Sequence, residues 1–162
     1  MRVPSIFSPE LIKSANASVL CWLATVDEHG QPNVSPKEIF EVRDTGHIVI
    51  ANIASPTSVR NVRKQHKVCV AFVDVFAQKG FKVYGSGREI RPNESDFQQW
   101  AHPVIAKAGS RFKVHSVVVI EAGVVEAILA PSYRFYAAET TEAMQVEAAM
   151  KAYGVQPVRR DA

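Results

Sequence analysis

The sequence predicts a mainly β fold in which about six antiparallel strands form a closed or partly closed barrel beside a few helices. Short apolar or alternating runs recur at hairpin spacing, and turn-forming residues separate them. The chain of 162 residues has room for one domain and contains no internal repeat or low-complexity linker. We therefore expect one domain over residues 1–162, with a flexible tail over 155–162.

The N-terminal part begins with a short helix. Ser8, Pro9 and Glu10 suit an N-cap and a first turn, and the helix should end near Ala17. Residues 19–26 form an apolar strand, and residues 27–30 a hairpin turn. Residues 33–42 alternate and predict one strand, in which Pro36 marks an edge or a bulge. Its two faces would carry Val34, Pro36, Phe40 and Val42 on one side and Ser35, Lys37, Ile39 and Glu41 on the other.

The remaining elements follow in the same way. Residues 44–46 form a turn, and residues 47–52, 67–76 and 81–90 form strands. Helices are expected from Ser55 to about His66, from residue 93 onward until Pro103 kinks or ends the helix, and over 139–153. Residues 113–129 form a long strand or a pair of strands, with a bulge or turn at Ala122 and Gly123.

Composition excludes several classes of protein. A net charge of +3 is too small for a nucleic-acid-binding surface, although its sign suits an anionic small molecule. The apolar runs are too short to span a membrane, and residues 1–4 begin no signal peptide, so a cytoplasmic protein is expected. Cys21 and Cys69 suggest buried free thiols. The histidines are scattered, which predicts no metal site.

Residues 52–63 are the first candidate for a binding site. A strand leads into a helix whose first turn carries the hydroxyl groups of Ser55, Thr57 and Ser58. Free N–H groups and the helix dipole make such a turn a natural phosphate site, to which Arg60 and Arg63 could add charge. The alternative is that Ser55 only caps the helix and the arginines are solvated.

Two further groups of residues support a site. Ser35 and Lys37 share a face that we expect to point outward, and the alternative is an ordinary solvent-facing strand. A site is favoured because this strand and the strand before Ser55 are consecutive and are expected to pair. Lys79 and Gly80 belong to a hairpin where lysine could meet a phosphate or a ring, although a merely charged hairpin tip is the alternative. The glycines of residues 85–87 lie within a strand and suggest a bend or a close backbone approach.

Read in order, these stretches resemble the FMN-binding split β-barrel of the pyridoxamine 5'-phosphate oxidase family. The resemblance runs through residues 23–27, 30–36, 50–52, 55–62, 68–73 and 80–87. It implies a six-stranded antiparallel split β-barrel with flanking helices, acting as a homodimer with the flavin at the subunit interface.

The resemblance also implies roles for particular residues. Ser35, Lys37, Thr57 and Ser58 would hold the FMN phosphate. Ala51 and Asn52 would lie beside the flavin. Lys79 and Gly80 would also lie beside it, supplied by the partner subunit.

The sequence departs from the family pattern at two places. The arginine that the oxidase has near Ser35, and its basic pair near Thr57, are absent, so Lys37, Arg60 or Lys79 would have to compensate. The C-terminal arginine-and-tryptophan segment is also missing, and only Arg159 and Arg160 stand in the tail. We therefore do not expect pyridoxamine phosphate oxidation.

The sequence thus predicts an FMN-dependent oxidoreductase with an unassigned small-molecule substrate. The flavin would supply the redox chemistry, so no catalytic acid, base or nucleophile is required of the protein. The alternatives are a deazaflavin-dependent reductase, a flavin-storage or electron-carrier protein without enzymatic activity, and a haem-binding protein with a histidine at the barrel mouth.

Overall fold

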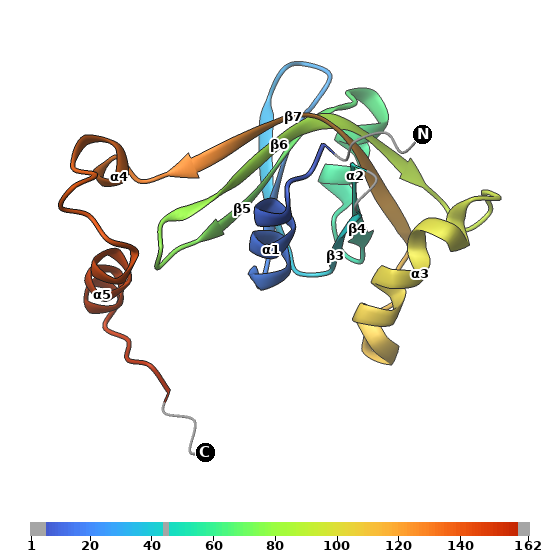
Figure 1. The fold of residues 1–162 in the computed structure, drawn as a ribbon. Coiled ribbons are helices and arrows are strands. Elements are labelled where there is room, and N and C mark those ends of the chain that lie inside the picture. Colours follow the sequence, from blue (N-terminus) through green and yellow to red (C-terminus); the bar gives the residue numbers. More distant parts are fainter. Residues whose placement is uncertain (1–5, 44–45, 159–162) are drawn as a thin grey trace, which may run out of the picture.

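The computed structural model describes residues 6–43 and 46–158 of the chain. Among these residues, seven strands form one antiparallel sheet in the order β2-β1-β5-β6-β7-β4-β3. The sheet curls into a half-barrel with helices beside it (Figure 1). The predicted fold class is confirmed, with seven strands in place of six. The predicted turn residues Asp44 and Thr45 and the tail residues Arg159 and Arg160 lie outside the described ranges.

The first hairpin forms as predicted. β1 (Cys21–Val26) pairs with β2 (Pro32–Lys37), and β2 is an edge strand, as Pro36 indicated. In the turn, the Asp27 carboxylate accepts hydrogen bonds from the backbone N–H groups of His29 at 2.9 Å and Gln31 at 2.8 Å. Gly30 supplies the left-handed conformation, with φ of +85°.

The prediction of one strand over residues 33–42 is wrong. The chain breaks after Lys37, and β3 (Phe40–Arg43) pairs with β4 (His47–Asn52), while β2 pairs with β1. As a result, β2 and β3 are neighbours in sequence but lie at opposite edges of the sheet. The alternation of apolar and polar residues resumes in phase at Phe40, so the sequence pattern alone could not reveal that the strand ends at Lys37.

Three long strands form the centre of the sheet. β5 (Lys67–Asp74) pairs with β6 (Lys79–Ile90), which pairs with β7 (Ser116–Leu129). Tyr84 lies opposite Val124 and Gly85 opposite Ala122, so Gly123 is the extra residue of the predicted bulge. A Cβ atom at position 85 would lie 2.2 Å from the carbonyl oxygen of Glu121, which confirms the close backbone approach.

The helices largely follow the sequence. α1 (Pro9–Ala17) is capped by Ser8, whose hydroxyl accepts a hydrogen bond from the Leu11 N–H at 3.2 Å. α2 (Pro56–Lys64) ends two residues before His66. α5 (Glu142–Tyr153) begins at its cap Thr141, not at Glu139, and the short α4 (Ser132–Phe135) was not predicted.

Pro103 does not end the third helix. α3 (Phe97–Ala108) continues through it, although the proline cannot donate to the carbonyl of Gln99. The guanidinium of Arg43 donates a hydrogen bond to that carbonyl at 2.6 Å and lies 4.8 Å from the ring centre of Trp100. A side chain from β3 therefore supplies the donor that the proline lacks.

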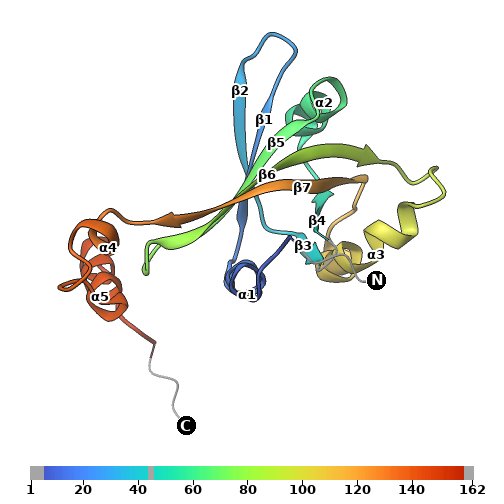
Figure 2. The ribbon, with the colours of Figure 1, turned by 45° about the horizontal axis from the view of Figure 1, so that its top comes forward.

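Two apolar clusters cover the sheet. In the larger cluster, side chains of α1 and α2 pack against one face of the sheet; its members include Leu11, Leu23, Val62, Phe72 and Ile120. The smaller places α3 against β4, β6 and β7 and includes Val49, Ile90, Ala101 and Val104. In the view of Figure 2, α1 lies below the central strands, α2 lies above them beside the hairpin of β1 and β2, and α3 lies at one end.

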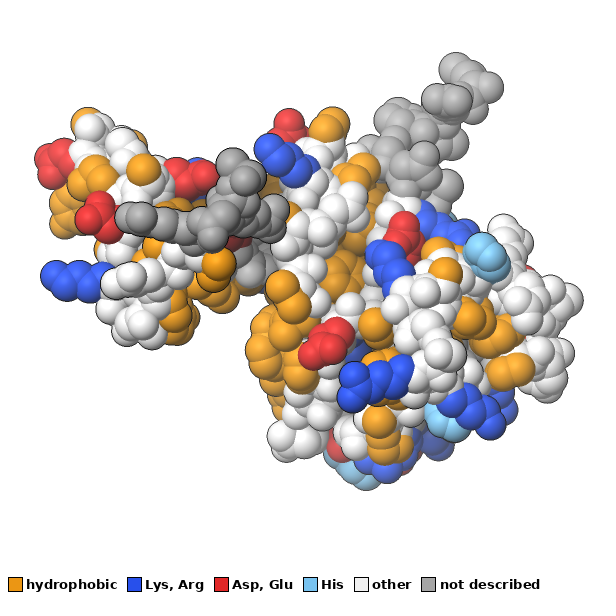
Figure 3. Space-filling model, turned by 90° about the horizontal axis from the view of Figure 1, so that it is seen from below, with side chains coloured by type: hydrophobic (Ala, Val, Ile, Leu, Met, Phe, Trp, Pro, Cys, Tyr) orange, Lys and Arg blue, Asp and Glu red, His pale blue; other side chains and the backbone are white. Residues whose placement is uncertain are grey.

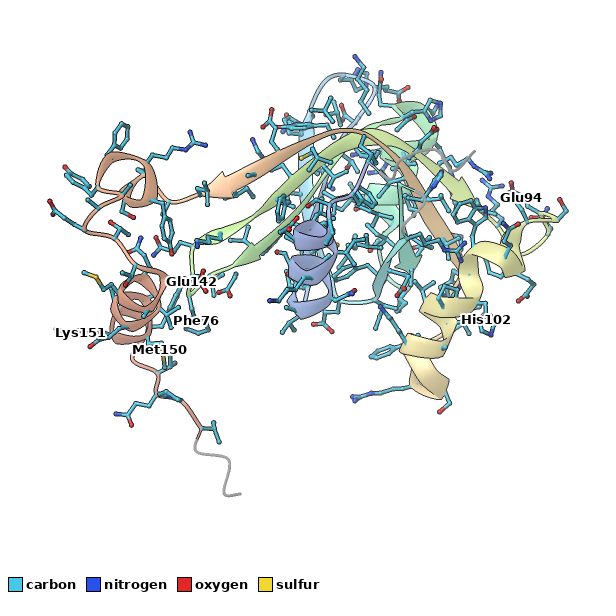
Figure 4. The ribbon with its side chains drawn as sticks, in the orientation of Figure 1. Phe76, Glu94, His102, Glu142, Met150 and Lys151 are labelled. Atoms are coloured by element: carbon cyan, nitrogen blue, oxygen red, sulfur yellow. The ribbon has the colours of Figure 1, made fainter. Side chains whose placement is uncertain are left out.

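The outer ends of β5, β6 and β7, together with α4 and α5, form an arm that stands away from the half-barrel (Figures 1 and 3). Within it, Lys79 forms an ion pair with Glu142 at 2.7 Å, and Phe76 meets the ring of Tyr153 edge-on (Figure 4). Hydrophobic side chains lie on the arm and on the side of the half-barrel that faces it (Figure 3). None of the described helices is long and apolar enough to cross a membrane.

The close pairing of β5 and β6 explains Gly80 and yields a prediction. A Cβ atom there would lie 1.9 Å from the carbonyl oxygen of Phe72, whereas one at Gly123 would be 3.5 Å from its nearest neighbour. Gly80→Ala should lower the free energy of unfolding by about 1–3 kcal/mol through overpacking. Gly123→Ala should change it by less than about 0.5 kcal/mol. Urea unfolding of both variants checks this, and equal stabilities would contradict it.

Candidate functional site

The centre of the candidate site is Lys37, the last residue of edge strand β2. Its side chain is buried, with 6% of the residue exposed. The ammonium nitrogen donates hydrogen bonds to the hydroxyl of Ser35 at 2.7 Å and to that of Ser55 at 2.6 Å. Ser55 lies in the turn between β4 and α2, so the ammonium links edge strand β2 to the turn that follows β4, the neighbour of the opposite edge strand β3.

Two predictions about this strand are wrong. Ser35 and Lys37 point inward, while Val34 is 61% exposed on the outer face. The strand that carries them also does not pair with the strand before Ser55. The two groups meet because the sheet curls until its edges face each other, and the inner face of β2 contacts α2. Strand alternation gives the period of a pattern but not which face is buried.

The charge of Lys37 has no carboxylate partner within the described part of the chain. Burial lowers the pKa of its ammonium below the ordinary value, while the nearby Cys21 thiol opposes the shift. Burial likewise raises the pKa of Cys21 to about 12, which keeps that thiol neutral. A buried ammonium with only neutral partners is costly unless an anion compensates it. The cluster therefore suits a phosphate group.

The first turn of α2 contributes to the same place. The side chain of Ser55 makes no capping hydrogen bond, so the interpretation of Ser55 as a mere cap is wrong. Its hydroxyl accepts from Lys37 instead. Thr57 is exposed in this turn and Ser58 is buried. The N–H groups at the start of the helix remain open to an acceptor from outside the helix.

Asn52 completes what we call the Lys37 cluster: Ser35, Lys37, Asn52 and Ser55. The Asn52 side-chain oxygen accepts from the Ser55 backbone N–H at 3.3 Å, and its amide nitrogen donates to the hydroxyl of Ser116 at 2.8 Å. The Ser116 hydroxyl in turn donates to the carboxylate of Glu89 at 2.7 Å. Sequence reasoning missed Ser116 and Glu89; the only signal was a polar residue at the start of the valine-rich strand β7.

A second buried hydrogen-bond group holds α2 in place, and sequence reasoning missed it too. The Thr25 hydroxyl accepts from the side-chain amides of Asn33 on β2 at 3.2 Å and Asn61 on α2 at 3.1 Å. Thr25 and Asn61 are 1% and 2% exposed. A polar residue next to Val62 on the apolar face of the helix was the available signal.

The other predicted residues lie elsewhere. Ala51 is buried in β4 one residue before Asn52, where its N–H donates to the carbonyl of Ile39. Arg60 is exposed on α2, and its charge acts on Asp27 in the hairpin turn. Lys79 and Gly80 lie at the start of β6, in the arm, which stands away from the strand β2 that carries Lys37 (Figure 2).

Titratable groups elsewhere form ion pairs but no metal site. No group of three or more His, Cys, Asp or Glu side chains among the described residues could hold a metal ion. Lys82 forms an ion pair with Glu126 at 2.8 Å, and Arg88 pairs with Asp96 at 2.5 Å. These cations are already neutralised, unlike Lys37.

Comparison with known proteins gives one family and many similar folds. The family model described as pyridoxamine 5'-phosphate oxidase matches residues 8–147. No curated protein sequence matches the chain significantly. Several solved structures share its fold at less than 25% sequence identity.

Three of these structures span most of their own length in the comparison. The HupZ protein of Group A Streptococcus is 22% identical with a TM-score of 0.62, covering 74% of this chain and 92% of its own. A putative pyridoxamine 5'-phosphate oxidase of Lactobacillus delbrueckii is 23% identical with a TM-score of 0.62, covering 74% and 93%. An FMN-binding protein of Syntrophomonas wolfei is 16% identical with a TM-score of 0.62, covering 75% and 88%.

The Thr25 group yields a prediction about stability. Thr25→Val keeps the shape of the side chain but leaves the Asn61 amide without its acceptor, which should lower the free energy of unfolding by about 1–3 kcal/mol. Thr25→Ser keeps the hydroxyl and loses one methyl group, at a cost of about 0.8 kcal/mol. Urea unfolding of both variants compares the two costs. A valine variant as stable as the serine variant would contradict this role of Thr25.

Proposed function

The chain belongs to the pyridoxamine 5'-phosphate oxidase family, and we propose that it binds FMN at the Lys37 cluster as an FMN-dependent oxidoreductase of a small-molecule substrate. One observation carries the proposal. The ammonium of Lys37 is buried between two hydroxyl groups with no carboxylate beside it in the described residues. A phosphate is the anion that the family places in this part of the fold.

The residues around Lys37 would hold the phosphate by charge and by directed hydrogen bonds. Lys37 supplies a charge-assisted bond, and the hydroxyls of Ser35, Ser55 and Thr57 surround the same turn. The N–H groups at the start of α2 add donors and the positive end of the helix dipole. Ser58 is buried within α2, so we assign it to the packing of the turn and not to direct contact.

When bound, the flavin supplies the redox chemistry. The task of this chain is then to bind, orient and partly desolvate the flavin. Asn52 and Ala51 at the end of β4 lie directly before the phosphate-binding turn and would border the body of the cofactor. Within residues 6–43 and 46–158, the hydrogen-bond partners of the Lys37 ammonium are the hydroxyl groups of Ser35 and Ser55.

We further propose that the protein is a homodimer formed by the outer face of the sheet. Five outward residues lie directly opposite one another across five strands: Val34, Ala24, Cys69, Tyr84 and Val124. Of these, Val34 is 61%, Tyr84 38% and Val124 56% exposed. A continuous apolar row of this kind is unusual on a solvent-facing sheet and suits an interface.

The arm supports the same proposal. It carries Lys79 and Gly80 at the start of β6, away from the strand β2 that carries Lys37 of the same chain (Figure 2). These two residues can therefore contribute to a flavin site only across an interface, as the family resemblance implies. A second copy of the chain is the partner that would bring them to the site.

The phosphate site is tested by a Lys37→Met variant. Loss of a charge-assisted hydrogen bond should weaken FMN binding about ten- to a hundredfold. The affinity of Lys37→Met for riboflavin, which has no phosphate, should differ from that of the wild type by less than about threefold. Burial lowers the pKa of the Lys37 ammonium in the free protein, and a bound phosphate raises it again. The ratio of the FMN affinities of the wild type and Lys37→Met should therefore shrink as the pH rises above the pKa of Lys37 in the free protein. Fluorescence titration of both ligands from pH 7 to 10 measures this.

Lys67→Met is the matched control, because Lys67 is an exposed lysine at the start of β5. It should leave both affinities unchanged. Equal FMN affinity of the wild type and Lys37→Met would remove Lys37 from the phosphate site. A wild type that retains no FMN after loading and desalting would contradict FMN as the cofactor.

The dimer is tested by charges placed in the apolar row. Val34→Glu combined with Val124→Glu should convert the dimer to a monomer, because burying two carboxylates at an interface is costly. Val19→Glu is the control, since Val19 is 84% exposed and lies outside the row. Light scattering after size-exclusion chromatography gives the mass. A monomeric wild type, or a double variant that stays dimeric, would contradict the proposed interface.

A further inference from the structure

We propose that Glu89 is a positioning residue that fixes the direction of the hydrogen bonds in the Lys37 cluster, although it would not touch the cofactor. This inference rests on the proposed binding of FMN phosphate at that cluster. It concerns a residue on β6, on the far side of β7 from Asn52.

Glu89 is held rigidly and stays ionised. Its side chain is 6% exposed and receives four hydrogen bonds. One oxygen accepts from Arg63 at 3.0 Å and Ser116 at 2.7 Å, and the other from Arg63 at 2.5 Å and Arg91 at 3.1 Å. Burial opposes ionisation, but the hydrogen bonds from Arg63, Ser116 and Arg91 lower the pKa of Glu89 to about 2. At neutral pH the carboxylate therefore only accepts hydrogen bonds.

An acceptor at this end sets the direction of the Ser116 hydroxyl and, through it, the orientation of the Asn52 amide. The Ser116 hydroxyl must donate to Glu89, so its oxygen can accept from the Asn52 amide nitrogen. The Asn52 oxygen then faces the Ser55 N–H and accepts from it. This places the Ser55 hydroxyl where it accepts from the Lys37 ammonium. The chain of bonds links the carboxylate to the proposed phosphate site.

A glutamine at position 89 would disturb this direction while keeping the shape. One carboxylate oxygen faces two arginine donors, and the other faces one arginine donor and Ser116. The amide nitrogen of a glutamine would therefore take the side with fewer arginine donors and would face Ser116. The Ser116 hydroxyl would then lose its acceptor, and its oxygen would no longer be reserved for Asn52.

Simple electrostatics predicts the opposite outcome, which makes the test sharp. Glu89 is negative, so its neutralisation should strengthen the binding of an anion if charge alone mattered. Neutralisation of Arg91 should weaken anion binding on the same argument. The directional role predicts weaker FMN binding for Glu89→Gln, and little change for Arg91→Gln, because that variant keeps the bond between Glu89 and Ser116.

The experiment titrates the full-length protein and its variants with FMN and with riboflavin. Glu89→Gln and Ser116→Ala should each weaken FMN binding about five- to tenfold, the effect of one misdirected hydrogen bond. Riboflavin affinity should fall by less than FMN affinity, because riboflavin lacks the phosphate and keeps only the contacts of the flavin body with Asn52 and Ala51. Arg91→Gln is the matched control and should keep FMN affinity within about twofold.

A double variant tests whether the two residues act through one path. The double variant Glu89→Gln with Ser116→Ala should bind FMN no more weakly than the weaker-binding single variant. Each substitution by itself already removes the hydrogen bond from Ser116 to Glu89, so the second has nothing further to remove. Thermal unfolding of each variant without ligand establishes that the titrated protein is folded at the assay temperature.

The outcomes separate this inference from the proposed function. If the wild type binds FMN but Glu89→Gln binds it equally well or more tightly, the positioning role is overturned alone. Equal losses for FMN and riboflavin, or additive losses in the double variant, overturn it as well. If the wild type does not bind FMN, the proposed function fails and the inference fails with it.

Discussion

The structure depends on how a curled sheet closes across its two edges. The chain breaks after Lys37, so β2 and β3 lie at opposite edges although they are consecutive in sequence. One contact near the split is polar: the Lys37 ammonium donates to the hydroxyl of Ser35 on edge strand β2 and to that of Ser55 in the turn after β4. Such a contact costs desolvation of a charge. The apolar clusters on the concave face and beneath α3 have to supply the stability that this contact does not.

Apolar packing and hydrogen bonding have separate tasks around α2. Val59 and Val62 join the larger apolar cluster, which fixes the distance of the helix from the sheet. Asn61 bonds to Thr25, which also holds Asn33 of the edge strand. Apolar contacts tolerate small sliding motions, whereas hydrogen bonds require a particular orientation. The start of α2 is therefore oriented, and not merely packed, against the strand that carries Lys37.

The sequence predicted local structure well and the spatial arrangement less well. The Ser8 cap, the turn glycine Gly30 and the bulge at Gly123 were correctly located, because each depends on residues close in sequence. The site residues Lys37 and Ser55 were predicted as parts of one site, but for the wrong reason, since their strands do not pair. The inward direction of Lys37 could not be read from alternation. Ser116 and Glu89 were missed because their link to Asn52 spans strands distant in sequence.

The net charge of the chain says less about anion binding than whether each Lys or Arg side chain already has a carboxylate partner. The net charge of +3 hardly distinguishes this protein from many others. Most cations named above are already bound to carboxylates, including Lys79 to Glu142, Lys82 to Glu126 and Arg63 to Glu89. The Lys79 and Lys82 pairs are exposed and screened by water, and the Arg63 charge is held by the buried Glu89 carboxylate, so these cations attract a further anion weakly. Lys37 is the only Lys or Arg residue buried among the described residues, and its nitrogen donates to hydroxyl groups and not to a carboxylate. An incoming phosphate would therefore be attracted by this one uncompensated charge, at the place where the helix start adds its N–H groups.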